Sequence, residues 1–258
     1  MSPVANQTAF TVVIPARFQS SRLPGKPLLD IAGKPMILHV VAQALKSGAT
    51  KVIVATDDLR IQDACEQAGV AVCMTNPGHE SGTDRITEVA VLENLDNNSI
   101  VVNVQGDEPL IPPAVINQVA ANLAARPDTG ICTLYSPIAE EAEFTNPNAV
   151  KLVTDEAGRV RYFSRAPIPW PRDGITPHTL ALAKRHIGLY AYRVSVLKQF
   201  VRWPLHPLEA TEKLEQLRAM AHGVSIHAAL CCQAIPAGVD TQADLDHVRH
   251  LLQQGHTA

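Results

Sequence analysis

The sequence predicts an α/β fold in which a mainly parallel sheet is covered by helices on both faces. Short apolar runs rich in β-branched residues recur along the first half of the chain, as expected of strands buried on both faces. Segments with helical periodicity separate these runs. Strands that alternate with helices at this spacing form βαβ units, and such units build a parallel sheet.

The elements follow one another in chain order. Strands are expected at residues 10–14, 51–56, 70–74, 100–104 and 131–135. Helices are expected at residues 36–46, 59–68, 83–93 and 113–125. Gly48 and Gly69 end the first two helices, and Asp57 or Asp58 offers a cap for the second. These signals place a helix between each pair of successive strands.

The regular alternation of strands and helices ends after about residue 145. Extended segments are expected at residues 150–154 and 186–193, with a proline-rich stretch between them, and this part of the chain reads as an inserted or appended substrate region. A helix at about residues 208–222, a strand at 224–229 and a last helix at 242–254 complete the chain.

Composition excludes several classes of protein. The 258 residues carry a formal net charge of −3 with acids and bases mixed throughout, which argues against a nucleic-acid partner. The sequence shows no long apolar stretch and no signal peptide, so we expect no membrane segment and a cytoplasmic location. The five cysteines lack CxxC spacing and sit in apolar runs, as packing thiols do in reducing compartments.

A cationic loop follows the first strand. It carries Arg17, Arg22 and Lys26, and the carboxyl edge of an open α/β sheet is where ligands bind. The loop lacks both the Walker A pattern and the GxGxxG fingerprint. Three cations of this kind can meet several phosphate oxygens at once. A solvated surface turn is the alternative, but Gly25 and the flanking prolines favour a shaped loop.

Three other positions carry candidate chemistry. Asp107 directly follows the strand at 100–104, and a carboxylate at this edge suits Mg²⁺ together with substrate phosphates. Ser81 opens a helix that also carries Arg85, so its free amides and the guanidinium fit a pyrimidine edge or a phosphate, although an ordinary capping turn has the same pattern. Taken alone, Asp240 is better explained as a cap of the last helix.

The stretch Pro15-Ala16-Arg17, followed by Ser20, Arg22 and Leu23-Pro24-Gly25-Lys26-Pro27-Leu28, resembles the signature loop of sugar-activating nucleotidyltransferases. The closest resemblance is to the CMP-Kdo synthetase family (3-deoxy-manno-octulosonate cytidylyltransferases). It continues through nearly the whole chain, in stretches that begin at Val54, Ser81, Val102, Asn146, Phe163, Arg185, Leu214 and Gly238.

The resemblance implies a Rossmann-like mixed, mainly parallel sheet with a smaller sugar-binding and dimerisation region. It divides the chain into a nucleotide-binding core (1–145), a sugar-binding and dimerisation region (146–223) and a return to the core (224–258). The implied reaction joins CMP from CTP to Kdo and releases diphosphate, for lipopolysaccharide biosynthesis. A homodimer is implied as well, although the apolar positions of the helix at 208–222 fit an internal core equally well.

The resemblance also implies a role for each site residue. Asp107 and Asp240 are implied to hold Mg²⁺, which reverses the capping interpretation of Asp240. Arg17, Arg22, Lys26 and Asp107 are implied to be catalytic, and the nucleotide is implied to contact Arg17, Ser20, Arg22, Lys26, Ser81, Arg85 and Gln105. The sugar pocket is implied to contain Arg165, His186, Tyr190, Glu215 and Gln216. The alternative for His186 is a satisfied core or interface histidine.

Three rival functions remain at this point. A cytidylyltransferase for another acidic sugar, such as a sialic acid or an amino analogue of Kdo, differs only in the sugar pocket. A non-catalytic nucleotide-binding regulator is expected to lack Lys26, Asp107 or Asp240, and all three are present. A dehydrogenase requires a glycine fingerprint that this chain does not have.

Overall fold

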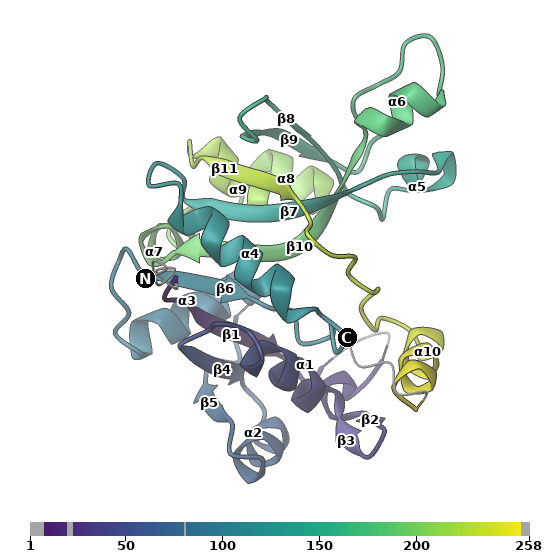
Figure 1. Ribbon diagram of the computed structural model, residues 1–258. Helices are drawn as coiled ribbons and strands as arrows, with labels where there is room; N and C mark the ends of the chain where they lie inside the picture. Colours follow the sequence, from purple (N-terminus) through teal and green to yellow (C-terminus); the bar gives the residue numbers. More distant parts are fainter. Residues whose placement is uncertain (1–7, 20–22, 80, 254–258) are drawn as a thin grey trace, which may run out of the picture.

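A mixed sheet of nine strands runs through residues 8–19, 23–79 and 81–253, the parts of the chain that the computed structural model describes (Figure 1). The strands are β1 (Thr11–Ala16), β4 (Lys51–Thr56), β5 (Ala71–Met74), β6 (Ile100–Asn103), β7 (Ile131–Pro137), β8 (Lys151–Thr154), β9 (Val160–Ser164), β10 (Lys184–Arg193) and β11 (Ile226–Leu230). Their order is β11-β7-β10-β6-β1-β4-β5, and β8 pairs with β10 and β9. Strand β10 is antiparallel to β6 and β7, whereas β1 is parallel to β4 and β6. The predicted mixed, mainly parallel sheet is confirmed.

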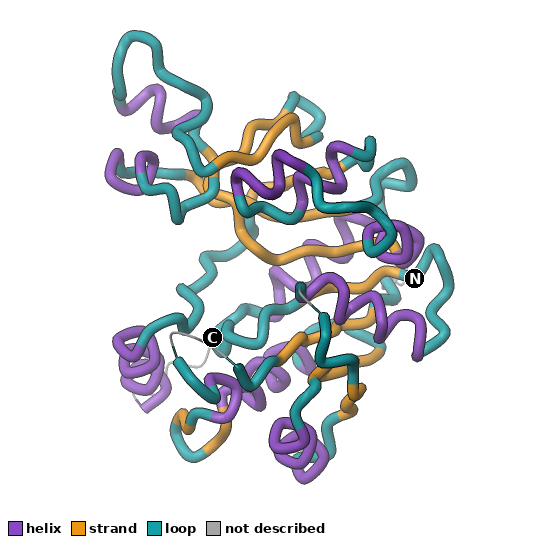
Figure 2. The backbone as a smooth tube through the Cα atoms, turned by 180° about the vertical axis from the view of Figure 1, so that it is seen from behind, coloured by secondary structure: helices purple, strands orange, loops and turns teal. Residues whose placement is uncertain are grey.

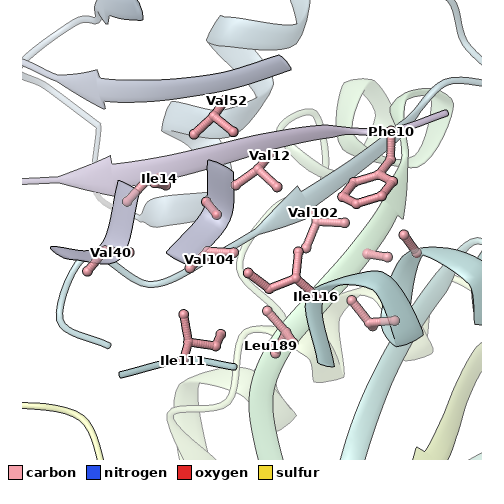
Figure 3. Close-up of a cluster of buried hydrophobic side chains, with 14 of the residues drawn as sticks. Phe10, Val12, Ile14, Val40, Val52, Val102, Val104, Ile111, Ile116 and Leu189 are labelled. Carbon is pink, nitrogen blue, oxygen red and sulfur yellow. The ribbon is translucent and has the colours of Figure 1, made fainter. Parts of the chain in front are cut away.

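Helices cover both faces of the sheet. One face packs against α1 (Met36–Leu45), α2 (Leu59–Gln67) and α4 (Pro113–Ala124), and the other against α3 (Gly82–Leu92), α7 (Val194–Phe200) and α9 (Gln216–Ala221) (Figures 1 and 2). Strand β1 shows why: Val12 and Ile14 join the first hydrophobic cluster, whereas Val13 between them joins the second. Figure 3 shows the first cluster around β1 and β6. Because successive residues of a strand point to opposite faces, a strand that is apolar at every position needs a helical layer on each face.

The expected strands and helices of the first half all form, each within a few residues of its predicted bounds. One prediction for the second half is wrong, because the single helix expected at 208–222 is two short helices, α8 (Pro207–Glu212) and α9. Lys213 ends α8 in the left-handed conformation, at φ 53°, and its backbone N–H donates to the carbonyl of Glu209. Leu214 and Leu217 are both buried beyond the break, so the apolar spacing survives without a continuous helix.

Several short elements were not expected. They are a 3₁₀ turn η1 (Lys26–Leu28), a two-stranded ribbon of β2 (Asp30–Ile31) and β3 (Lys34–Pro35), the strand β9, and the helices α5 (Glu141–Thr145), α6 (Pro177–Leu182) and α7. Each is too short to show a periodic apolar pattern.

A separate apolar cluster docks the last helix, α10 (Gln242–Gln253), next to the cationic loop. Leu245 and Val248 of α10 pack with Val239, Ile31 and Met36, and all five side chains are buried. The backbone N–H of Val239 donates to the carbonyl of Asp107 at 2.8 Å. This cluster therefore brings the end of the chain back to the loop that follows β6.

The region at 146–223 supplies β8, β9 and β10 to the same sheet as the first half of the chain. Helix α6 and its loop lie at the periphery, beyond the ends of β8 and β9 (Figure 1). Within the described parts of the chain, no helix combines the length and the apolarity that a membrane crossing requires. The division into three segments at 145 and 223 stays a prediction.

Candidate active site

The loops after β1 and β6 enclose a cavity of about 390 Å³ at the carboxyl edge of the sheet. Its lining includes Arg17, Lys26, Gln105 and Asp107, all of them predicted site residues, together with Gly82 at the start of α3. We call this space the nucleotide cavity, after the ligand that the resemblance implies for these residues. Strands β1 and β6 are adjacent and parallel, so the residues that follow them necessarily meet at one edge.

Two glycines let the walls of the nucleotide cavity approach each other. A Cβ on Gly106 would stand 2.8 Å from the carbonyl oxygen of Pro15, too close for any side chain. Gly25 has φ 68°, the left-handed region that glycine adopts without strain, and a Cβ there would stand 3.1 Å from the ring of Phe18. The described part of the cationic loop at Gly25 is therefore a shaped turn, because its backbone depends on glycine at this point.

Lys26 joins the two predicted metal ligands. Its Nζ donates to Asp107 Oδ2 at 2.7 Å, to Asp240 Oδ1 at 3.2 Å and to the carbonyl of Val239 at 2.9 Å. The Lys26 side chain is 15% exposed, against 33% for Asp107 and 48% for Asp240. Two carboxylates that lie 133 residues apart in sequence thus converge on one cation beside the nucleotide cavity.

Glu108 directly follows Asp107 in the same loop. Burial, together with the adjacent charge of Asp107, raises the pKa of Glu108 to about 8. Within the described residues, no donor reaches its buried Oε2. This carboxyl group lines a second cavity of about 550 Å³, which also contains Arg185, His186 and Gln233.

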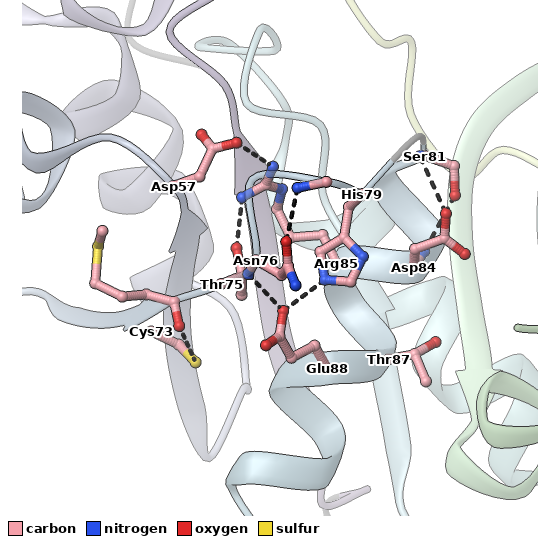
Figure 4. A network of polar contacts seen from close by, with 12 residues as sticks. Asp57, Cys73, Thr75, Asn76, His79, Ser81, Asp84, Arg85, Thr87 and Glu88 are labelled. Atoms are coloured by element: carbon pink, nitrogen blue, oxygen red, sulfur yellow. Dashed lines mark hydrogen bonds and ion pairs between the residues drawn. The ribbon is translucent and has the colours of Figure 1, made fainter.

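Ser81 and Arg85, two predicted nucleotide ligands, make local structural contacts at the start of α3. Ser81 and Asp84 form a capping box, in which Ser81 Oγ accepts from the Asp84 N–H and Asp84 accepts from the Ser81 N–H (Figure 4). Arg85 is fully buried, and its guanidinium donates to Asp57 at 2.7 Å and to Thr75. Arg85 lies outside the lining of the nucleotide cavity, so its position does not support the predicted contact with nucleotide.

The cationic loop is described only in part. Arg17 is half-buried, and its Nη2 donates to the carbonyl of His79 at 2.5 Å. The predicted ligands Ser20 and Arg22 lie outside the described residues.

His186 and Tyr190 share one face of β10, as their spacing predicts. Their rings lie 5.2 Å apart, and His186 also contacts the Phe163 ring at 5.0 Å. Nε2 of His186 is 3.0 Å from Thr133 Oγ1, and burial lowers the pKa of His186 to about 3. The histidine is therefore neutral near pH 7 and offers hydrogen bonds rather than charge.

Glu215 and Gln216 lie at the start of α9, beside the same face of the sheet. Thr83 of α3 donates to Glu215 Oε2 at 2.6 Å, and no described residue donates to the buried Oε1. Burial raises the pKa of Tyr190 well above its usual value, and the charges of Tyr192 and Glu215 add to the effect. Gln216 is the first residue of α9 and is partly exposed. Thr83, the partner of Glu215, directly follows Gly82, which lines the nucleotide cavity.

The Arg165 guanidinium is bound by backbone carbonyls. Its guanidinium donates to the carbonyls of Glu212 at 2.6 Å, Pro147 at 3.0 Å and Lys213 at 3.3 Å. Contacts thus bring His186, Tyr190 and Glu215 together near α3 and β10, whereas Arg165 supports the break between α8 and α9.

Comparison with known proteins identifies the family. The family model described as Cytidylyltransferase matches residues 11–226. The 3-deoxy-manno-octulosonate cytidylyltransferase of Saccharophagus degradans is 57% identical, over 95% of this chain and 98% of its own length. The enzyme of the same name from Cellvibrio japonicus is 56% identical, over 96% of this chain and 99% of its own length. The chain belongs to the 3-deoxy-manno-octulosonate cytidylyltransferase family.

Solved structures agree with this family assignment. The structure of CMP:2-keto-3-deoxy-manno-octonic acid synthetase complexed with CTP matches with a TM-score of 0.88 and 43% identity, over 96% of this chain and 99% of that one. A cytidylyltransferase from Leptospira borgpetersenii matches with a TM-score of 0.62 at 14% identity, over 96% of this chain and 87% of that one, which shows a shared fold alone.

Three residues that line the second cavity were not singled out by the sequence analysis. Arg185 is 50% exposed and pairs with Glu143 at 2.9 Å, and it offers a positive charge close to His186. Glu108 and Gln233 complete the set. Arg185 and Glu108 each adjoin a predicted ligand in sequence, which is a usable signal, whereas no pattern marks Gln233.

Proposed function

We propose that this chain transfers CMP from CTP to the acidic sugar Kdo and releases diphosphate, a reaction that serves lipopolysaccharide biosynthesis. One observation carries the proposal: Lys26, Asp107 and Asp240 converge beside a cavity that Arg17 and Gln105 line. Relatives at 53–57% identity over 95% of the chain bear the corresponding name. A non-catalytic regulator would be expected to lack Lys26, Asp107 or Asp240, and all three are present.

The two carboxylates fit Mg²⁺. Among residues 8–19, 23–79 and 81–253, no group of three or more His, Cys, Asp and Glu side chains is arranged to hold a metal ion. Mg²⁺ suits this situation, because it commonly takes one or two carboxylates and completes its octahedron with water and substrate phosphates. Asp107 and Asp240 already share one cation, the Lys26 ammonium, so their oxygens are arranged around positive charge. When bound, Mg²⁺ would neutralise charge on the phosphates and lower the pKa of the attacking hydroxyl.

The residues of the chain position the reaction. Arg17 and Lys26 bind the triphosphate, and Gln105 lines the same cavity. The anomeric hydroxyl of Kdo attacks the α-phosphorus, a new O–P bond forms, and the bond to the β-phosphate oxygen breaks as diphosphate leaves. Fixed cations stabilise the charge that accumulates on the phosphate oxygens during this transfer.

The sugar binds beside α3 and β10 in this proposal. His186 and Tyr190 form one wall, and Glu215 and Gln216 contact hydroxyl groups of the sugar. Buried hydrogen-bonding groups of this kind reject a sugar that leaves them unpaired. Arg165 and Arg185 are the cations available to the sugar carboxylate, and the exposure of Arg185 to the second cavity favours it.

A substrate panel tests the proposed function. The purified protein is assayed for diphosphate release with CTP, UTP, ATP or GTP, against Kdo or N-acetylneuraminate, with EDTA as the control. We expect release only with CTP, Kdo and Mg²⁺ together. Activity with another acidic sugar would keep the mechanism and change the substrate, whereas no release under any condition would contradict an enzymatic function.

We also propose a cytoplasmic homodimer. Its five cysteines are free thiols, as is usual in a reducing compartment. Leu214 and Leu217 pack inside the molecule, so they do not form the proposed interface. Trp170, in the loop before α6, and Leu182, the last residue of α6, are 72% and 55% exposed. We expect sedimentation equilibrium to give twice the chain mass, and Trp170→Asp with Leu182→Asp to give the chain mass. A monomeric wild-type protein would contradict the proposal.

A further inference from the structure

Glu88 of α3 holds the segment that leads from β5 into α3. Its Oε2 accepts from the backbone N–H of Asn76 at 2.8 Å and from Nε2 of His79 at 2.5 Å (Figure 4). The Asn76 side chain in turn accepts from the N–H of Gly78 at 2.8 Å. One carboxylate oxygen thus fixes both ends of the turn at 76–79.

The same turn is bonded to the cationic loop. The carbonyl of His79 accepts from Arg17 Nη2 at 2.5 Å, and Arg17 lines the nucleotide cavity. Arg17 follows β1, whereas His79 follows β5, so this bond joins two loops that are 62 residues apart. A continuous chain of contacts therefore leads from Glu88 through His79 to the guanidinium of Arg17.

Burial and charge strengthen the hydrogen bonds in this chain of contacts. The side chains of His79 and Glu88 are only 21% and 29% exposed. Desolvation acts to raise the pKa of Glu88, but hydrogen bonds from Asn76 and His79 outweigh it, and the pKa is lowered. Hydrogen bonds to an ionised carboxylate are shorter and stronger than neutral ones. Beside the turn, Arg85 donates to Thr75 and Asp57, which ties the segment to the ends of β4 and β5.

We propose that Glu88 is a positioning residue, which fixes the carbonyl of His79 and thereby aims the guanidinium of Arg17 at the triphosphate. Arg17 uses one Nη to bind this carbonyl, so the direction of its remaining N–H groups depends on where the carbonyl lies. The inference rests on the proposed function, because it assumes that Arg17 binds phosphate. Displacing a phosphate-directed group by about 1 Å costs up to about 10²-fold in rate.

A double-mutant cycle tests the proposal. Wild type, Glu88→Ala, Arg17→Ala and the double variant are compared by kcat/KM for CTP. We expect Glu88→Ala to lower kcat/KM by about 10- to 100-fold in the wild type and by less than about twofold in the Arg17→Ala background, since coupled residues are not additive. Glu88→Gln should recover most of the activity, because its amide oxygen can still accept both from the Asn76 N–H and from Nε2–H of a neutral His79 ring.

Glu93→Gln is the matched control, because Glu93 caps the C-terminal end of α3 and pairs with Lys51 on the surface, away from Arg17. Where Glu88→Ala fails to fold by circular dichroism, the cycle is run with His79→Ala, which removes the ring but keeps the carbonyl. Equal losses in both backgrounds would show a general structural role and overturn the inference. An Arg17→Ala variant with full activity would overturn both the inference and the proposed role of Arg17 in binding phosphate.

Discussion

Replacing Asp107 by Asn is expected to lower kcat by about 10²–10³-fold, the cost of removing one electrostatic group from a transition state. The change keeps the size of the side chain and removes its charge. The backbone of the loop keeps its bond from Val239 to the Asp107 carbonyl, so the fold of the site should persist. Because hard oxygen ligands bind Mg²⁺ through charge, the Mg²⁺ concentration for half-maximal activity should rise as well.

The measurement is a Mg²⁺ titration of steady-state diphosphate release, with Asp246→Asn as the matched control. Asp246 lies on α10, is 60% exposed and pairs with Arg249 and Gln242 of the same helix. Its substitution should leave kcat and the Mg²⁺ dependence unchanged. Near-normal turnover by Asp107→Asn, with an unshifted Mg²⁺ curve, would contradict the assignment of Asp107.

Replacing Lys26 by Met should lower kcat/KM for CTP by a similar factor, about 10²–10³. The long apolar stem remains, but the point charge directed at the phosphates is lost. A second effect follows in the free protein, because Asp107 and Asp240 lose the cation that lies between them. The two carboxylates then repel each other, so the melting temperature of the variant should fall and should recover on addition of Mg²⁺ more than that of the wild type.

Lys34→Met is the control for Lys26→Met, since Lys34 is exposed in the β2–β3 ribbon. It should change neither the kinetics nor the response of the melting temperature to Mg²⁺. An equal Mg²⁺ response in Lys26→Met and wild type would show that Lys26 and the metal ion do not share a site.

The fold was predictable where apolar patterns are long. Strands β1, β4 and β6 are buried on both faces, and helices α1 and α4 run for ten or more residues, so their sequences carry a clear period. The break between α8 and α9 was not predictable, because it depends on Lys213 in a left-handed conformation that glycine usually marks. Leu214 and Leu217 lie beyond the break and are buried all the same, so their apolar spacing did not reveal it.

The site was predictable where residues directly follow a strand. Arg17 and Asp107 lie at the carboxyl edge because β1 and β6 are adjacent and parallel. Asp240 needed the resemblance to a known family, since only the packing of α10 brings it to Lys26. The burial of Arg85 against Asp57, and the contact of Glu88 with His79, depend on side-chain partners that no local pattern reveals.

In the proposed reaction CMP moves from CTP to the sugar, and the fate of labelled phosphate tests this transfer most directly. The protein is incubated with Kdo, Mg²⁺ and CTP labelled at either the α- or the γ-phosphate, and the products are separated. We predict that α-label appears in a sugar nucleotide and that γ-label appears only in diphosphate. Transfer of γ-label to the sugar, or α-label found only in free CMP, would contradict this account.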